Sequence, residues 1–260
     1  MKRTKIYRIP YPVPKEIGDA CYGAQLYDSS CSPEARVYFI DRDGGMYLKR
    51  GSKGTLFAEA RMNTYFHSKG LGPEVLCYAS EDADWLLTRR VGGEDCTDRE
   101  FLQDPKRLAH ILGEELRRLH ELDSSDCPIQ NRMQSYFSTV TKNYQDRIFD
   151  PAYYAYGNAI SADEAYSIVD VGKASLDSRV LLHGDYCLPN IMLKDWRLQG
   201  FIDLGGGGVG DRHIDLYWGA WTLKFNTGTD QYRDIFFGAY GRELVEDDKL
   251  RVIGAAECFG

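Results

Sequence analysis

Three polar residues in the second half of the sequence have the types and the spacing needed to hold a metal ion that in turn binds phosphate oxygens. Asp185 follows one short apolar run, Asn190 begins the next, and Asp203 closes a third. We expect each run to be a strand, and side chains at strand ends can converge on one site. Carboxylate and carboxamide oxygens suit Mg²⁺ with bound phosphate, and the set lacks the His and Cys typical of zinc. A lone Asp would be interpreted as a turn cap, but the three together favour phosphate chemistry.

The same segment resembles the catalytic loop of kinases. It contains H-x-D-x-x-x-x-N over 183–190 and D-x-G over 203–205, the pattern in which kinases orient the acceptor hydroxyl and hold metal ions. The forms H-G-D and D-L-G are most similar to the aminoglycoside phosphotransferase family, and within it to the 3′-phosphotransferases. The similarity continues in Gly208-Val-Gly-Asp-Arg212, in Asp215 and in Leu122-Asp-Ser-Ser-Asp-Cys-Pro128. It is strong from about residue 180 to 235 and weak in the first thirty residues.

This resemblance implies a bilobal protein-kinase-like fold of the α+β class, with a sheet-rich N-terminal lobe and a mainly helical C-terminal lobe. It implies that Asp185 is the catalytic base that accepts the proton of the substrate hydroxyl. Asn190 and Asp203 would hold the Mg²⁺ ions that bridge the phosphates of ATP, with GTP left open as an alternative donor. His183 is expected to be a structural residue of the loop. Phosphoryl transfer depends mostly on positioning and charge neutralisation, so these groups suffice for its core.

The resemblance also assigns a nucleotide-binding set to the N-terminal lobe. Lys49, at the end of an expected strand, would be the phosphate-binding lysine, and Glu59, early in the following helix, would be its partner. Tyr47 would stack on adenine, although an ordinary cross-strand tyrosine explains this residue nearly as well. A strand lysine considered alone would be interpreted as an exposed side chain, so the functional interpretation of Lys49 depends on the downstream motif.

Two further parts of this lobe would contact the nucleotide. Backbone groups around Arg90 and Val91 would meet the adenine edge, and the loop 29–35, which contains Ser32, would cover the phosphates. The sequence has no G-x-G-x-x-G loop, which departs from protein kinases and agrees with the antibiotic kinases. It has no G-x-x-x-x-G-K-[ST] motif, which excludes a P-loop kinase. H-R-D, D-F-G and A-P-E are also missing, so a protein kinase is the least favoured interpretation.

The expected acceptor is a cationic aminoglycoside, and acidic groups are the candidates to bind it. The family places an acidic cluster at its C-terminus, where this chain has Glu257 and the terminal carboxylate of Gly260. Ala256 replaces one acid of the usual pair. Asp163 and Glu164 are further candidates, although a helix N-terminus explains both residues equally well.

The segment after D-L-G is a second departure from the family. Related enzymes carry an Arg here, whereas this chain has Gly205–Gly208. We expect a more flexible loop at an entropic cost, and the missing Arg puts catalytic efficiency in doubt. Asp211, Arg212 and Asp215 are expected to brace the loop, with a surface turn as an equal explanation for Arg212.

Hydrophobic periodicity predicts the elements that position these residues. The expected strands are 36–40 and 46–49 (a hairpin), 74–79, 85–88, 180–182, 191–193 and 198–202. The expected helices are 56–68, 104–121, 134–149, 161–173 with Ser161 as N-cap, and the chain beyond Asp215. The expected elements change from mostly strands to mainly helices near 89–93. This change predicts a nucleotide-binding lobe at 1–91 and a catalytic and substrate-binding lobe at 92–260.

Composition and charge limit the function classes. Of the 260 residues 43% are hydrophobic and 27% are charged, which is typical of soluble globular proteins. A net charge of −7 argues against nucleic acid as a partner. The seven cysteines are odd in number and contain no C-x-x-C pair, which predicts a reducing compartment without a disulfide framework. No signal peptide or membrane segment is evident, so we expect a cytoplasmic protein with no membrane partner, as a monomer or weak dimer.

The leading hypothesis is an enzyme that transfers the γ-phosphate of ATP to an aminoglycoside hydroxyl, the 3′-hydroxyl, and so gives resistance to antibiotics such as kanamycin. A kinase for another small hydroxyl compound (a choline-like amine, a sugar or a different antibiotic) is the alternative that the thinner acidic ending favours. A nucleotide-binding protein with little turnover is a third. The glycine run supports it, and the intact set of Asp185, Asn190, Asp203 and Lys49 opposes it.

Overall fold

A computed structural model describes residues 3–31, 35–156 and 160–260 of the chain. The chain forms two compact units, one from Met1–Asp95 with Ile191–Gly205 and the other from Cys96–Asn190 with Gly206–Gly260. The first segment thus ends near the lobe boundary expected at residue 91. We did not predict that a later segment returns to the first unit.

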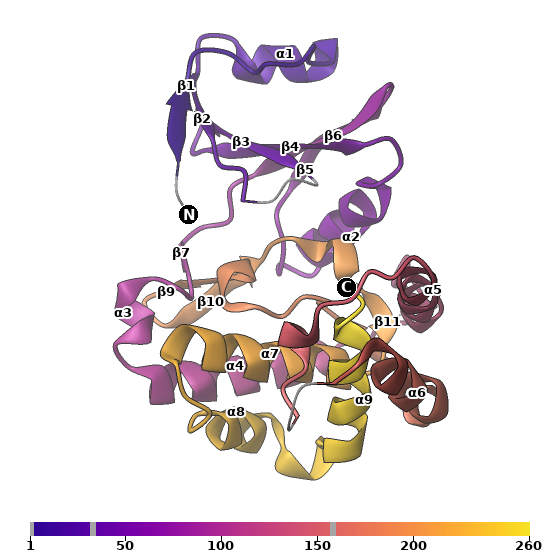
Figure 1. The fold of residues 1–260 in the computed structure, drawn as a ribbon. Coiled ribbons are helices and arrows are strands. Elements are labelled where there is room, and N and C mark those ends of the chain that lie inside the picture. The colour runs from indigo at the N-terminus through magenta and orange to yellow at the C-terminus, as the bar shows by residue number, and fades with distance from the viewer. Residues whose placement is uncertain (1–2, 32–34, 157–159) are drawn as a thin grey trace. The chain divides into compact units, whose positions relative to one another are not determined.

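The first unit contains an antiparallel sheet of six described strands in the order β1-β2-β3-β4-β6-β5 (Figure 1). Its strands are β1 (Thr4–Ile6), β2 (Gln25–Asp28), β3 (Arg36–Asp41), β4 (Met46–Ser52), β5 (Val75–Ser80) and β6 (Ala83–Arg89). The predicted hairpin is confirmed as β3 and β4, where Phe39 pairs with Tyr47 and Val37 with Lys49. Alternating apolar side chains of these strands, including Tyr38, Ile40 and Leu48, form the core of the sheet.

The described part of the first unit contains the helices α1 (Lys15–Cys21) and α2 (Phe57–Ser68). Helix α2 confirms the predicted helix 56–68. The sequence analysis did not predict α1, β1 or β2, because these elements are short and show little apolar periodicity. Met62 and Phe66 of α2 are fully buried, so this helix is held by tertiary packing of its apolar face.

The returning segment adds a small sheet to the first unit. Strands β7 (Glu94–Asp95), β9 (Ile191–Lys194) and β10 (Arg197–Phe201) lie in the order β10-β9-β7. Asp195 and Trp196 connect β9 to β10 and both have positive φ angles, as a two-residue type I′ hairpin requires. The tight turn sets the register of β10 and therefore the position of the residues that follow it.

The second unit is mainly helical, as predicted. Its α-helices are α3 (Arg99–Leu102), α4 (Pro105–His120), α5 (Arg132–Gln145), α6 (Ala162–Gly172), α7 (His213–Thr227), α8 (Arg233–Tyr240) and α9 (Asp247–Glu257). Strand β8 (Val180–Leu182) pairs with β11 (Gly208–Gly210), and the short 3₁₀ helix η1 (Pro151–Tyr153) precedes α6. Helix α5 begins two residues before, and ends four residues before, the predicted helix 134–149. Helix α6 has the predicted Ser161 cap as a full capping box with Glu164.

The glycine run packs more closely than the sequence suggested. Gly184 has a φ of +85°, and a Cβ there would lie 1.9 Å from the carbonyl oxygen of Gly206. A Cβ at Gly208 would lie 2.8 Å from Ile129 Cγ2. We expected the whole run to be a loop, but its last residue, Gly208, begins strand β11. Close approach therefore accounts for Gly206 and Gly208, where we expected added flexibility, whereas a Cβ at Gly205 would make only ordinary contacts at 3.7 Å.

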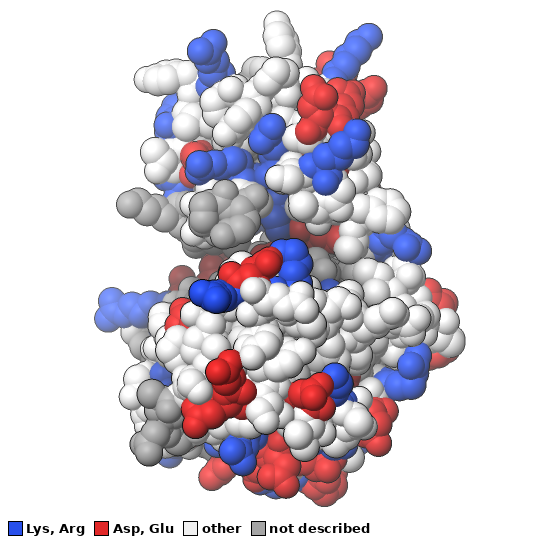
Figure 2. Space-filling model, turned by 45° about the vertical axis from the view of Figure 1, so that its right-hand side comes forward, with Lys and Arg blue, Asp and Glu red and all other residues white. Residues whose placement is uncertain are grey.

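Two observations concern the surface. None of the described helices combines the length and apolar character needed to cross a membrane. On the face that Figure 2 shows, both basic side chains (Lys and Arg) and acidic side chains (Asp and Glu) lie at the surface.

Helices α4 and α8 pack so closely at Gly113 that a Cβ there would lie 2.4 Å from the carbonyl oxygen of Phe236. Ala is favoured over Gly in a helix by roughly 0.5–1 kcal/mol, but overpacking costs about 1–3 kcal/mol. We therefore expect Gly113→Ala to lower the melting temperature, measured by calorimetry. The matched control is Gly238→Ala on α8, where a Cβ would meet nothing within 4 Å, and which should raise it slightly. Equal effects of the two changes would contradict this packing.

Candidate active site

The ammonium group of Lys49 lies between two carboxylates in the first unit. Its Nζ is 2.8 Å from Glu59 Oε2 and 2.8 Å from Asp203 Oδ1. Lys49 comes from β4, Glu59 from the first turn of α2 and Asp203 from the end of the segment that contains β10. Three separate elements therefore bring together the three residues of this unit that the sequence analysis selected for phosphate and metal binding.

Electrostatics keep this lysine charged. Burial alone would lower the pKa of Lys49, but the attraction of Glu59 and Asp203 outweighs burial and raises it. Burial raises the pKa of Glu59, and the charge of Lys49 opposes that rise. Removing Lys49 would leave the Glu59 carboxyl buried without its partner, which is strongly destabilising. The pair thus fixes a permanent cation at a defined position, as a phosphate site needs.

Asp203 has an unusual backbone. Its φ is +59°, a left-handed conformation that Asp tolerates better than most residues and that is often found at functional sites. About half of the Asp203 side chain is exposed, so the carboxylate can take a further ligand beside Lys49. The sequence showed this residue only through the D-x-G pattern.

Tyr47, Arg90 and Val91, which were also selected in the first unit, occupy ordinary structural positions. The Tyr47 ring packs against Phe39 on the neighbouring strand, with ring centroids 5.2 Å apart, and its hydroxyl accepts a hydrogen bond from Arg3. The Arg90 guanidinium bonds to the Gly93 carbonyl and to Glu94, and the adjoining residue 91 is partly buried.

Ser32 lies outside the described residues, so its expected place over the phosphates is a prediction. The Tyr47 contacts are those of the cross-strand alternative. They leave the adenine-binding role of this residue a prediction as well.

In the second unit, a buried carboxylate fixes the loop that carries Asp185. Asp215, from the first turn of α7, accepts hydrogen bonds from the backbone N–H groups of His183 (2.8 Å) and Gly184 (2.7 Å). His120, at the end of α4, lies 3.1 Å from the same carboxylate. Asp215 thus holds the loop that carries Asp185, whereas we expected it to brace the glycine loop after Asp203. His183 is structural in that its Nδ1 accepts from the Asp185 N–H.

Asn190 orients the Asp185 side chain. Its Nδ2 donates to Asp185 Oδ2 at 2.8 Å and to the Asp185 carbonyl at 3.0 Å. The same bonds leave the Oδ1 atom of Asn190 as the group that can ligate a cation. The five-residue spacing between Asp185 and Asn190 in the H-x-D-x-x-x-x-N motif therefore lets the two residues hydrogen bond and close a small loop.

The available oxygen donors fit a Mg²⁺ site that substrate phosphates complete, rather than a metal site made only of protein ligands. The described residues contain no cluster of three or more His, Cys, Asp or Glu side chains suited to hold a metal. Mg²⁺ is commonly held by one or two protein oxygens together with substrate phosphates. The second oxygen of Asp203 in the first unit and the amide oxygen of Asn190 in the second are each donors of that kind, and their binding of Mg²⁺ stays a prediction.

Asp185 opens into a cavity of about 250 Å³ in the second unit. Nine residues line it: Arg132, Tyr136, Thr139, Gly184, Asp185, Ile214, Trp218, Glu257 and Gly260. The cavity brings together the proposed base and two of the predicted acceptor-binding residues, which lie far apart in the sequence. Arg132, Tyr136 and Trp218 were missed. For Trp218 a signal existed, because it follows Asp215 by one helical turn.

Glu257 is a buried acid within this cavity. Its Oε1 accepts a 2.7 Å hydrogen bond from the Tyr136 hydroxyl. Burial raises the pKa of Glu257 to about 7, with the Tyr136 and Trp218 hydrogen bonds opposing the rise and the charge of Asp185 adding to it. The carboxyl therefore changes charge near neutral pH, next to Asp185.

Asp163 and Glu164 do not line this cavity. Glu164 forms the capping box of α6 with Ser161, and Asp163 accepts a hydrogen bond from the Tyr144 hydroxyl. These contacts match the helix N-terminus that we considered as the other explanation.

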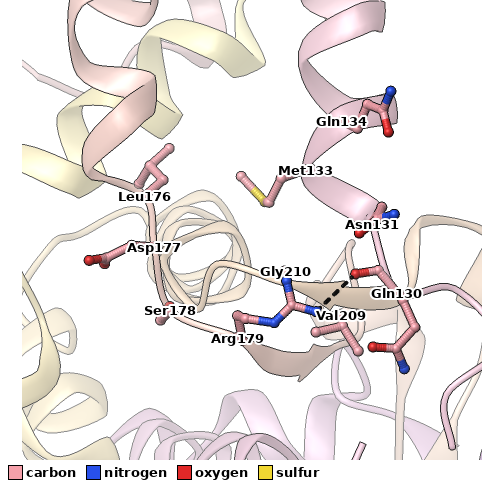
Figure 3. Close-up of a pocket in the computed structure, with 10 residues that line it drawn as sticks. All are labelled: Gln130, Asn131, Met133, Gln134, Leu176, Asp177, Ser178, Arg179, Val209 and Gly210. Atoms are coloured by element: carbon pink, nitrogen blue, oxygen red, sulfur yellow. Dashed lines mark hydrogen bonds between the residues drawn. The ribbon is translucent and has the colours of Figure 1, made fainter. Parts of the chain in front are cut away.

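A larger cavity of about 370 Å³ also lies in the second unit. Figure 3 shows its lining from the start of α5, the chain before β8 and strand β11, with Arg179 donating to the Gln130 carbonyl. It contains none of the residues that we selected for chemistry, so size alone does not locate the reaction.

The fold and the two residue sets define a kinase-like phosphotransferase. A profile of the phosphotransferase enzyme family matches residues 30–252, and the chain belongs to this family. A probable aminoglycoside 3′-phosphotransferase of Lactococcus lactis is 47% identical over 248 residues, which are 95% of each chain. An aminoglycoside 3′-phosphotransferase of Niallia circulans is 30% identical over 76% of each chain.

Solved structures agree on the fold. An aminoglycoside 3′-phosphotransferase of type VIII matches with a TM-score of 0.78 at 20% identity, over 95% of this chain and all of that one. An aminoglycoside phosphotransferase of Streptomyces rimosus, in complex with ADP and streptomycin, matches with a TM-score of 0.73 at 24% identity, over 86% and 90% of the chains. The predicted protein-kinase-like fold and the assignment as a small-molecule phosphotransferase are confirmed.

The raised pKa of Glu257 predicts pH-dependent stability. The unfolded chain loses this proton near pH 4.5 and the folded chain near pH 7. The associated stabilisation is therefore present below about pH 4.5 and is lost as the pH rises to about 7. Glu257→Gln cannot ionise and removes this dependence. The difference in melting temperature, wild type minus variant, should be larger at pH 5 than at pH 8, by an amount equivalent to about 3 kcal/mol. A difference that does not change with pH would contradict the assignment.

Proposed function

We propose that this enzyme transfers the γ-phosphoryl group of ATP to the 3′-hydroxyl of an aminoglycoside and so gives resistance to it. The observation that carries this proposal is the cavity in which Asp185, oriented by Asn190, faces the buried acid Glu257. The identity with 3′-phosphotransferases over nearly the whole chain supports the same acceptor.

In this proposal Asp185 is the base. The acceptor hydroxyl donates a hydrogen bond to the Asp185 carboxylate, which takes the proton as the oxygen attacks phosphorus. Because Nδ2 of Asn190 fixes one carboxylate oxygen, the base is aligned before the acceptor binds. Such positioning is the main source of catalysis in phosphoryl transfer.

The first unit supplies charge neutralisation. Lys49, held by Glu59 and Asp203, would bind the nucleotide phosphates as a compact cation. Asp203 and Asn190 would hold Mg²⁺, which when bound supplies neutralisation of the phosphate charge. Tyr47, Arg90, Val91 and Ser32 would contact the nucleotide as the resemblance implies.

The acceptor would be recognised by its positive charge. Glu257 and the terminal residue Gly260 line the cavity beside Asp185, and their carboxylates attract ammonium groups. Tyr136, Trp218 and Ile214 form the apolar part of the wall. Ala256 is fully buried next to Glu257, so position 256 does not supply the second side-chain acid that related enzymes have there.

Several further parts of the expectation belong to this proposal. Residues 1–91 would be the nucleotide-binding lobe and 92–260 the catalytic and acceptor-binding lobe. The donor would be ATP or GTP. The protein would act in the cytoplasm, as a monomer or weak dimer, without nucleic acid or membrane as partner. Asp163 and Glu164 would be secondary acceptor contacts.

The test is ADP release by the purified enzyme with Mg²⁺ and ATP, with and without kanamycin. We expect release that depends on kanamycin. ADP release with a choline-like amine or a sugar, but not with kanamycin, would show that the acceptor is that compound and not an aminoglycoside. ATP binding without release on any acceptor would favour a nucleotide-binding protein with little turnover.

Asp185→Asn is the matched variant for this assay. The acceptor then lacks its base, so kcat should fall by about 10²–10⁴-fold while ATP binding, followed by calorimetry, is retained. Turnover within tenfold of the wild type would refute the role of Asp185.

A further inference from the structure

One basic side chain lines the cavity that contains Asp185. Of the nine described residues in its lining, Arg132 alone is a lysine or an arginine. The acidic side chains of that lining are Asp185 and Glu257. The proposed acceptor is itself a cation, and like charges repel each other at the short distances inside a site. Binding of the acceptor therefore does not explain an arginine in this wall.

Helix α5 directs Arg132 toward the cavity. Arg132, Tyr136 and Thr139 are four and three residues apart, the spacing that places side chains on one face of a helix, and all three line the cavity. The Tyr136 hydroxyl donates to Glu257 Oε1 at 2.7 Å, which ties this face to the acid of the cavity. Because α5 begins at Arg132, the arginine lies at the end of the face.

The backbone of Arg132 has a fixed place relative to the proposed base. The sulfur of Met133 accepts a hydrogen bond from the Asp211 N–H at 3.2 Å. A Cβ at Gly210 would lie 3.5 Å from the Cβ of Arg132. Strand β11, which ends at Gly210, pairs with β8, and the loop that carries Asp185 directly follows β8. The start of α5 is thus packed against the strand pair from which the reacting loop emerges.

The guanidinium group of Arg132 has room for an anion. Its printed side-chain partner in the described part of the chain is Ser135 Oγ, at a long 3.3 Å, and no described carboxylate is close enough to form an ion pair with it. Burial lowers the pKa of Arg132, while Tyr136 and Glu257 oppose that fall, and arginine stays protonated in proteins. A partly buried cation without an ion-pair partner costs free energy, so an arriving anion would be stabilised here.

The anion that reaches this cavity in the proposed reaction is the phosphoryl group. The acceptor oxygen bonds to phosphorus while its proton passes to Asp185, so the phosphorus must approach a hydroxyl that Asp185 holds. The non-bridging oxygens of the phosphoryl group then carry negative charge near Asp185 and Glu257, which repel it. Arginine presents paired N–H donors that match the geometry of phosphate oxygens. Arg132 is therefore placed to offset a repulsion that the acids of the cavity create.

We propose that Arg132 is a further catalytic residue, whose guanidinium group donates hydrogen bonds to the non-bridging oxygens of the phosphoryl group during its transfer. This inference rests on the proposed function. In the step, the bond between the acceptor oxygen and the γ-phosphorus forms. The bond from that phosphorus to the β-phosphate oxygen breaks, and ADP leaves with its electron pair. The proton goes to Asp185, and Arg132 stays protonated throughout.

Arg132→Gln tests this role, because it removes the charge and keeps a polar side chain. With Mg²⁺, ATP and kanamycin, kcat should fall by about 10²–10³-fold, as when one donor to transition-state charge is removed. The affinity for kanamycin, measured by calorimetry, should be equal or higher, because a cation that repels the acceptor is gone. A residue that only shapes the acceptor site would lower that affinity. Arg132→Lys keeps the charge without the paired donors and should have an intermediate kcat.

Two further measurements separate charge neutralisation from a structural role. ADP with aluminium fluoride imitates the phosphoryl group in transfer, so its inhibition constant in the presence of kanamycin should rise in Arg132→Gln by the factor by which kcat falls. Arg132→Ala should regain activity when free guanidinium is added to the assay, whereas a misfolded variant would not. The matched control is Arg179→Gln, which changes an exposed arginine of the same unit in the other cavity and should leave kcat unchanged.

The outcomes distinguish this inference from the proposed function. Equal kcat values of wild type and Arg132→Gln with kanamycin would overturn the role of Arg132 and leave the proposed function in place. A lower kcat with unchanged inhibition by ADP and aluminium fluoride, and without rescue by guanidinium, would overturn it as well. No turnover of kanamycin by the wild type would overturn the proposed function, and the role of Arg132 with it.

Discussion

The geometry of the reacting loop depends on one buried carboxylate. Asp215 is completely shielded from solvent, and its two oxygens accept the backbone N–H groups that immediately precede Asp185. Hydrogen bonds to an ionised acceptor are among the strongest in proteins, and a buried charge without them is severely penalised. These bonds hold the loop in the conformation in which Asp185, shortly after the end of β8, lines the cavity. Helix α7, which carries Asp215, is thereby tied to the base.

His120 and Tyr240 extend this arrangement into the helical core. His120 bonds to Asp215 on one side and to the Tyr240 hydroxyl on the other, and burial lowers the pKa of His120. Gly184 and Gly206 approach so closely that neither position has room for a side chain. Lys49, Glu59 and Asp203 form a second, independent set in the first unit. The catalytic account thus depends on two small polar networks, each positioned by buried elements.

The sequence was informative where the chemistry is local. We could predict the short strands beside Asp185, Asn190 and Asp203, the hairpin that carries Lys49, and the Ser161 cap. Each of these features depends on residues that are neighbours in the sequence. The walls of the cavity could not be predicted, since Tyr136 and Glu257 are 121 residues apart and meet only in the folded chain. Gly206 and Gly208 were misread for a similar reason. Glycines that permit close packing and glycines that permit flexibility look alike in a sequence.

The central claim is that the cavity at Asp185 holds the 3′-hydroxyl of an aminoglycoside for phosphorylation. The most direct test compares ADP release with kanamycin B and with its 3′-deoxy derivative, which differs only by that oxygen, under the same Mg²⁺-ATP conditions. The account predicts turnover of kanamycin B and none of the 3′-deoxy compound, with the phosphate located at the 3′-oxygen by NMR. Comparable turnover of the two compounds would contradict it, since the phosphate would then be transferred to another position.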